Sequence, residues 1–144
     1  MNLDRYRQLF VDEASEHLQQ MASALTVLGS SERAEEHAGA IDSLFRMTHS
    51  IKGMAASLDY DAISSLAHRL EDWLSPARSM NALAEGGLPL IYEVVGALEM
   101  MVSQVEEAAS SPQARDDLME RSVSHLRLTE RGRLIADSIL AELL

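Results

Sequence analysis

The sequence predicts an all-α fold, an up-and-down antiparallel helical bundle, and three features of its 144 residues support this. Apolar residues recur at spacings of three and four along several long segments, which is the period of a helix with one buried face. Aromatic residues make up only 4% of the chain and there are only 3 prolines, which favours helices over strands. The connections between the segments are short, so successive helices should be antiparallel neighbours. We expect a four-helix core followed by a fifth, C-terminal helix.

The first two expected helices span Leu3 to Leu28 and about Ser31 to Leu58. Asn2 is the expected N-cap of the first helix and Gly29 its stop. The residues predicted to face the core from the first helix are Tyr6, Phe10, Ala14, Leu18, Met21, Leu25 and Leu28. Those predicted to face it from the second helix are His37, Ile41, Leu44, Thr48, Ile51, Ala55 and Leu58.

The third expected helix begins at the N-cap Asp61, after a turn at 58–61, and runs to about Ser75, where Pro76 should end it. A loop over 77–87 leads to a fourth helix that begins near Pro89. The core positions predicted for these two helices are Ile63, Leu66, Ala67, Leu70 and Leu74, then Ile91, Val94, Leu98, Met101, Val105 and Ala108. We expect residues 1–110 to form the four-helix domain. Residues 111–144 should form a helix that packs on it or leads into a linker.

Charge and composition exclude several function classes. The net charge is −11, and a nucleic-acid binder needs a basic face. The chain has no cysteine, which excludes disulfides and zinc–thiolate sites. No apolar run approaches the roughly 18 residues of a membrane span, and the N-terminus lacks the apolar segment of a signal peptide. The expectation is a cytoplasmic protein without membrane insertion.

His49 is the candidate reactive residue. It lies one position, about 100°, away from the predicted core residue Thr48 on the second helix. Phe45, Lys52 and Gly53 share its flank at helical spacing. One ring edge should therefore meet the bundle while the other faces solvent, and a nucleophilic imidazole needs such a position.

Glu71 is the expected partner of His49. The histidine lies about ten residues before the turn at Asp59 and Glu71 about as far after it, and antiparallel helices rise equally per residue. The two side chains should then come level. Glu71 could accept a hydrogen bond from one ring nitrogen of His49 and leave the other as the nucleophile.

A small basic patch is expected around His49 in this acidic chain. Arg46 and Lys52, the only lysine, flank it on its own helix, and Arg69 lies on the facing one. Such cations would favour a dianionic phosphoryl group, and His68, one turn before Glu71, could join the network. His49, His68 and Glu71 could alternatively chelate zinc. The positive charge of Lys52 disfavours this, so no metal site is predicted.

The sequence LFRMTHSIKGMAASLDY, followed by LAHRLEDWL, resembles the histidine phosphotransfer (HPt) domain at the N-terminus of the chemotaxis histidine kinase CheA. The shared pattern is a helix with His-Ser-Ile-Lys-Gly, a short turn, and a helix with His-x-x-Glu. The segment FVDEASEHL in the first helix also looks like the family's opening helix. The resemblance covers 3–74 well and the rest only as a helical pattern.

The resemblance implies a role for each matched residue. His49 would be phosphorylated, Glu71 would orient it, and Lys52 and His68 would support the phosphoryl group. Gly53 would let a partner approach. A separate kinase domain, of the same or a partner subunit, would carry ATP and Mg²⁺, and receiver domains of the CheY and CheB type would take the phosphoryl group onto an aspartate. No cofactor is implied in this chain.

Two positions depart from the family pattern. Met54 stands where many members have a second glycine, and Asp59 stands in the turn where glycine is common. Asp tolerates the left-handed conformation, so we expect the turn to form. Arg46, Gly53, Met54 and Arg69 are the residues expected to meet a partner.

Two alternatives remain open at the level of sequence. The chain could be a structural helical adaptor that has lost phosphotransfer, although the presence of His49, Lys52 and Glu71 together argues against this. The chain could also be an excised part of a longer histidine kinase or a free-standing phosphotransfer protein. No phosphate-binding loop is visible, so enzymatic activity would belong to the longer protein.

Overall fold

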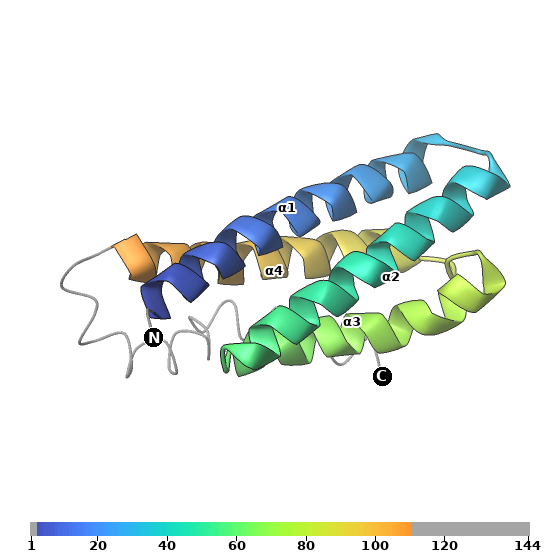
Figure 1. Ribbon diagram of the computed structural model, residues 1–144. Helices are drawn as coiled ribbons and strands as arrows, with labels where there is room; N and C mark the ends of the chain where they lie inside the picture. The colour runs from blue at the N-terminus through green and yellow to red at the C-terminus, as the bar shows by residue number, and fades with distance from the viewer. Residues whose placement is uncertain (1–2, 111–144) are drawn as a thin grey trace.

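The computed structural model describes residues 3–110 and shows a bundle of four α-helices (Figure 1). The helices are α1 (Leu3–Ser30), α2 (Ala34–Ser57), α3 (Asp61–Met80) and α4 (Gly87–Ser110). The all-α prediction is confirmed. The expected fifth helix over 111–144 lies outside the described residues, as does Asn2.

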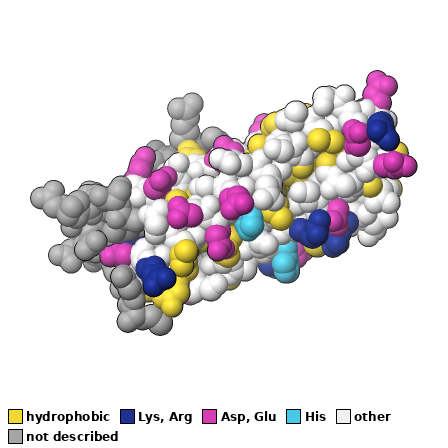
Figure 2. Space-filling view, turned by 45° about the horizontal axis from the view of Figure 1, so that its top comes forward, with side chains coloured by type: hydrophobic (Ala, Val, Ile, Leu, Met, Phe, Trp, Pro, Cys, Tyr) yellow, Lys and Arg dark blue, Asp and Glu magenta, His cyan; other side chains and the backbone are white. Residues whose placement is uncertain are grey.

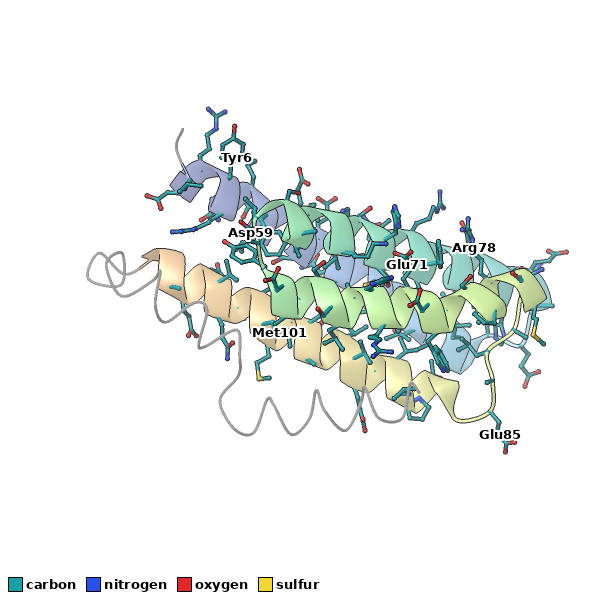
Figure 3. All side chains as sticks on the ribbon, turned by 90° about the horizontal axis from the view of Figure 1, so that it is seen from below. Tyr6, Asp59, Glu71, Arg78, Glu85 and Met101 are labelled. Atoms are coloured by element: carbon teal, nitrogen blue, oxygen red, sulfur yellow. The ribbon has the colours of Figure 1, made fainter. Side chains whose placement is uncertain are left out.

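The helices form a closed bundle, because α1 packs on α2 and α4 while α3 packs on the same two helices. The predicted apolar stripes form the core of this bundle. The largest side chains with almost no exposure are Met21, Leu25, Ile41, Leu44, Ile51, Ile63, Leu66, Leu70, Leu74, Ile91, Leu98 and Met101. The prediction for Tyr6 was wrong. Its side chain is 46% exposed and points away from the bundle near the start of α1 (Figure 3). The first residue of α1 in the core is Phe10.

Several helix ends differ by a few residues from the expectation. Gly29 belongs to α1, which ends at Ser30. The second helix begins at Ala34 rather than near Ser31, because the Ser31 hydroxyl accepts the backbone N–H of Arg33 at 3.2 Å and keeps this segment out of the helix. The fourth helix begins at Gly87. Pro89 then lies in its first turn, where no backbone N–H is needed.

Pro76 does not end α3, which continues to Met80. A proline inside a helix removes one hydrogen bond and crowds the preceding turn. The following turn is held by tertiary contacts: Ala77 is only 7% exposed, and Arg78 Nε donates to Asp42 Oδ1 on α2 at 2.9 Å. The helix ends at Met80, and the next residue, Asn81, caps it in the left-handed conformation with φ 54°. Long-range contacts therefore outweigh the local preference at Pro76.

The turn between α2 and α3 is tight and fixes the pairing of the two helices. Asp59 adopts φ 59°, so the expected tolerance of aspartate for this conformation is confirmed. Tyr60, rather than Asp61, is the residue before the helix, and Asp61 is the first helical residue. The Tyr60 ring lies 5.0 Å from the Phe10 ring, centroid to centroid. This contact anchors the turn to α1.

Within the described residues, one helix is long and apolar enough to cross a membrane by length and composition alone. It is the segment Gly87–Ala108 of α4, with a mean hydropathy of 1.3. Its apolar face packs in the core of the bundle, where Ile91, Val94 and Leu98 have no exposed surface. A core helix passes the same test, so this segment is weak evidence for membrane insertion.

Candidate functional site on the second and third helices

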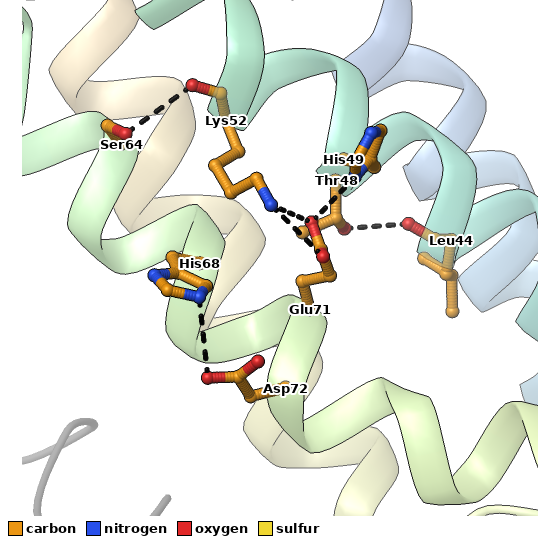
Figure 4. Close-up of polar contacts among 8 residues, drawn as sticks. All are labelled: Leu44, Thr48, His49, Lys52, Ser64, His68, Glu71 and Asp72. Carbon is orange, nitrogen blue, oxygen red and sulfur yellow. Dashed lines mark hydrogen bonds and ion pairs between the residues drawn. The ribbon is translucent and has the colours of Figure 1, made fainter. Parts of the chain in front are cut away.

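His49 and Glu71 meet across the two antiparallel helices α2 and α3 (Figure 4). The Nδ1 atom of His49 lies 3.0 Å from Oε2 of Glu71, and the histidine side chain is 63% exposed. A carboxylate can only accept here, so the pairing places the ring hydrogen on Nδ1. The other ring nitrogen, Nε2, then carries a free lone pair on an exposed side chain.

The core positions next to these two residues explain where they point. Thr48 and Leu70 have no exposed surface, and His49 and Glu71 each follow one of them in the sequence. A single step along a helix turns a side chain by about 100°, from the core to its edge. The Thr48 hydroxyl donates to the Leu44 carbonyl at 2.6 Å, so its polar group needs no other partner. The buried face of α2 thus sets the direction of His49.

Lys52 binds both carboxylate oxygens of Glu71. Its Nζ lies 3.1 Å from Oε1 and 2.9 Å from Oε2. The side chains of Lys52 and Glu71 are 24% and 16% exposed, so this ion pair is better shielded from water than His49. Glu71 therefore bridges the lysine and the histidine in one cluster.

The same contacts set the ionisation of Glu71. Desolvation acts to raise its pKa, but the hydrogen bonds and positive charge from Lys52 and His49 outweigh this and hold the pKa below its usual value. Glu71 is accordingly a carboxylate at neutral pH. A carboxylate stabilises positive charge on the imidazole ring, and such charge develops when Nε2 attacks an electrophile.

Ser64 adds a contact for which sequence reasoning gave no role. Its hydroxyl donates to the Lys52 backbone carbonyl at 3.4 Å and so joins α3 to α2 about two turns before Glu71. The helical spacing of Ser64 with His68 and Glu71 placed it on the correct face of α3. The identity of its acceptor could be known only from the packing of the two helices.

No hydrogen bond or ion pair joins His68 to His49 or Glu71 in the described residues. Its Nε2 lies 3.7 Å from Oδ2 of Asp72, and the two side chains are 61% and 67% exposed. Because Asp72 lies one turn further along α3, the pair stays on the outer surface of that helix. The expected place of His68 in the His49 network is therefore not seen, and its role stays a prediction.

The basic residues near His49 have different surroundings. Arg46 is 66% exposed, and its Nε lies 3.0 Å from Oδ2 of Asp42 on the same helix. Arg69 is exposed on α3. Figure 2 shows basic side chains gathered beside a histidine on a face where acidic side chains are otherwise more numerous.

Gly53 is exposed, and a Cβ atom added to it would meet no other described residue within 4 Å. A close helix crossing at this glycine is therefore not seen among the described residues. The open space leaves the α2 backbone accessible beside His49. Met54 is half-buried and packs against the core, so only part of its side chain can meet a partner.

The described residues contain no group of three or more histidine, cysteine or acidic side chains placed to hold a metal ion. His68 is turned toward Asp72, and both oxygens of Glu71 are taken by Lys52. The zinc alternative built on His49, His68 and Glu71 is therefore not supported by the geometry.

Comparison with known proteins gives the same family as the motifs. The Hpt domain family model matches residues 5–127. Chemotaxis protein CheA of Bacillus subtilis is 30% identical over 106 residues, which cover 73% of this chain and 15% of that protein. CheA of Listeria monocytogenes is 32% identical over 99 residues, or 68% of this chain and 16% of that protein.

CheA of Treponema pallidum is 29% identical over 120 residues, which cover 81% of this chain and 14% of that protein. No solved structure matches the chain. The chain thus spans about one seventh of the length of these curated relatives. With the His-Ser-Ile-Lys-Gly motif on α2 and a family match over most of its length, the chain belongs to the Hpt domain family.

Proposed function

We propose that this chain is the phosphotransfer domain of a CheA-type chemotaxis histidine kinase and that His49 carries the phosphoryl group. The observation that carries the proposal is the 3.0 Å contact from His49 Nδ1 to Glu71 on an otherwise exposed ring. It holds the ring with Nε2 accessible and without a hydrogen, as a nucleophile requires.

In the first step, the Nε2 lone pair attacks the γ-phosphorus of ATP bound to a separate kinase domain. The bond from that phosphorus to the β–γ bridging oxygen breaks, and ADP leaves with the bonding electrons. The ring keeps its Nδ1 hydrogen and becomes a cation. Its hydrogen bond to the Glu71 carboxylate is then charge-assisted and stronger.

In the second step, a carboxylate oxygen of an aspartate on a receiver domain attacks the phosphorus. The N–P bond breaks, an acyl phosphate forms, and the bonding electrons return to Nε2. His49 is neutral again with its hydrogen still on Nδ1. Neither step requires a proton to be removed from the ring, so the domain needs an orienting acceptor rather than a strong base.

The surroundings of His49 fit a partner that supplies the catalytic groups. The exposed ring and the open space over Gly53 allow another active site to approach α2. The proposed partners are an ATP- and Mg²⁺-binding kinase domain, of the same or a partner subunit, and receiver domains of the CheY and CheB type. Cytoplasmic localisation without membrane insertion belongs to the same proposal.

The experiment is to incubate the chain with a CheA-type kinase core and radiolabelled ATP and then test the acid stability of the label. A phosphohistidine loses its label in acid and keeps it in base. His49→Gln should remove the label, whereas His37→Gln, which changes a histidine near the start of α2 that contacts the Ser31 carbonyl, should remain labelled. An unlabelled wild-type chain, or equal labelling of His49→Gln, would favour the adaptor alternative.

A further inference from the structure

Asp42 on α2 holds two arginines, one from each of the helices that carry the phosphotransfer site. Arg46 on α2 approaches Oδ2 at 3.0 Å, and Arg78 on α3 approaches Oδ1 at 2.9 Å, each through its Nε atom. Figure 3 shows Glu71 and Arg78 on the same side of α3. The Asp42 cluster therefore lies further along the same pair of helices as the His49 cluster.

The two arginines differ in how many contacts fix their guanidinium groups. The Arg78 guanidinium also lies 4.4 Å from the centroid of the Phe45 ring, so it has a cation–π contact in addition to its hydrogen bond. Arg46 pairs only with Asp42 among the described residues, and its side chain is 66% exposed. Exposed ion pairs between residues four apart on a helix contribute little to stability. Arg46 can therefore leave Asp42 at small cost while Arg78 keeps the carboxylate paired.

Of the two arginines that pair with Asp42, Arg46 is the one on the same helix as His49. It lies three residues before the histidine, on the same flank of the helix. Helical side chains lean toward the N-terminus, so the His49 ring leans over the turn that carries Arg46. Lys52, the other cation on this flank, is already bound to both oxygens of Glu71. A dianion on His49 Nε2 would be the strongest local attraction for the Arg46 guanidinium.

We propose that phosphorylation of His49 transfers Arg46 from Asp42 to the phosphoryl group, and that Arg78 then holds Asp42 alone. Asp42 is thereby a positioning residue, which keeps Arg46 beside the site while His49 is unmodified and competes for it afterwards. The inference rests on the proposed function, because it requires a phosphoryl group on His49.

The test uses the whole chain, phosphorylated chemically with phosphoramidate so that no kinase is needed. The first readout is the arginine Nε–H spectrum, in which the Arg46 signal should shift on phosphorylation while the Arg78 signal stays in place. The second is the pKa of the phosphoryl group, followed by phosphorus NMR. The charged groups around it are Arg46 and Lys52 on α2, and Glu71 with the exposed His68, Arg69 and Asp72 on α3.

A nearby cation lowers the pKa of a phosphoryl group, so Arg46→Gln should raise it by about half a unit. Asp42→Asn should lower it, because Arg46 loses its competing partner. Arg78→Gln should raise the phosphoryl pKa, because Asp42 then has no other arginine and stays paired with Arg46. Arg33→Gln removes the same charge from a residue that precedes α2 and pairs with Glu35 and Glu36, so it should change nothing.

The possible failures are distinguishable. If His49 becomes phosphorylated but Arg46→Gln leaves the phosphoryl pKa unchanged, the transfer of Arg46 is refuted and the proposed function stands. An Arg46 Nε–H signal that does not move on phosphorylation has the same meaning. If phosphoramidate produces no phosphohistidine at position 49, the inference fails together with the proposed function.

Discussion

Glu71→Gln is the substitution that most directly tests the orientation of His49. Glutamine keeps the size and shape of the side chain and can still place an oxygen 3.0 Å from His49 Nδ1. It removes the negative charge that stabilises the cationic ring and that binds Lys52. We expect a folded domain that accepts the phosphoryl group from a kinase more slowly than the wild type.

The size of the effect follows from the kind of hydrogen bond that is lost. A hydrogen bond to a charged group contributes about 1.5–3 kcal/mol and a neutral one about 1 kcal/mol. Because the His49 side chain is 63% exposed, the smaller part of this difference applies. A loss of about 0.5–1 kcal/mol corresponds to phosphorylation that is about two- to fivefold slower.

The assay is the initial rate of label transfer from a CheA-type kinase core under single-turnover conditions, with folding checked by circular dichroism. Asp72→Asn is the matched control, because it removes one carboxylate from the same turn of α3, and among the described residues Asp72 pairs only with the exposed His68. It should change the rate by less than twofold. Equal rates for wild type and Glu71→Gln, or equal losses in both variants, would refute the orienting role.

The remaining predictions concern pH, partner access and stability. The pKa of Glu71 is lowered in the folded state, so its ionised form stabilises the fold above the usual glutamate pKa of about 4.3, and this contribution disappears as the pH falls through the lower folded value. Urea unfolding at pH 3 to 6 should therefore show the stability difference between wild type and Glu71→Gln shrinking toward acid, and a constant difference would contradict the assigned pairing. Gly53→Leu should leave the fold intact and raise the free energy of unfolding by up to about 1 kcal/mol, because its Cβ meets no described residue within 4 Å and leucine favours helix. The same variant should lower kcat/KM for phosphotransfer, and undiminished transfer would show that no partner approaches there. Pro76→Ala should raise the free energy of unfolding by about 1–2 kcal/mol, since the helical cost of proline exceeds its effect on the unfolded chain; a lower midpoint in urea would be the contrary result. Leu70→Ala should cost about 2–5 kcal/mol in the same measurement, because the side chain is fully buried beside Glu71.

The positions of His49 and Glu71 could be predicted from the sequence because they depend on two regular quantities. The buried stripes gave the rotation of each helix, and Asp59 marked the turn from which the equal rise of α2 and α3 could be counted. That count predicted that the two side chains come level, and the structure places His49 Nδ1 3.0 Å from Glu71 Oε2. The same periodicity predicted most of the core but missed buried residues beside the stripes, such as Val11, Val95 and Val102.

Other features could not be predicted because they depend on contacts between distant residues. Pro76 remains inside α3 because the turn after it is bound to α2 through Asp42, which lies 36 positions away from Arg78. His68 shares a face with Glu71 in sequence, but its ring is directed to Asp72 and away from the site. Rotamers and surface pairings of this kind are not fixed by helical spacing.

The sequence by itself determined the four helices, their antiparallel order and the pairing of His49 with Glu71, because each follows from the hydrophobic period and the rise of a helix. The tertiary structure alone decided that Lys52 binds both oxygens of Glu71 and that the space over Gly53 is open. It also decided that Asp42 is shared by two arginines from different helices. The reason is that such contacts depend on the separation of the packed helices and on side-chain direction, which no local pattern encodes.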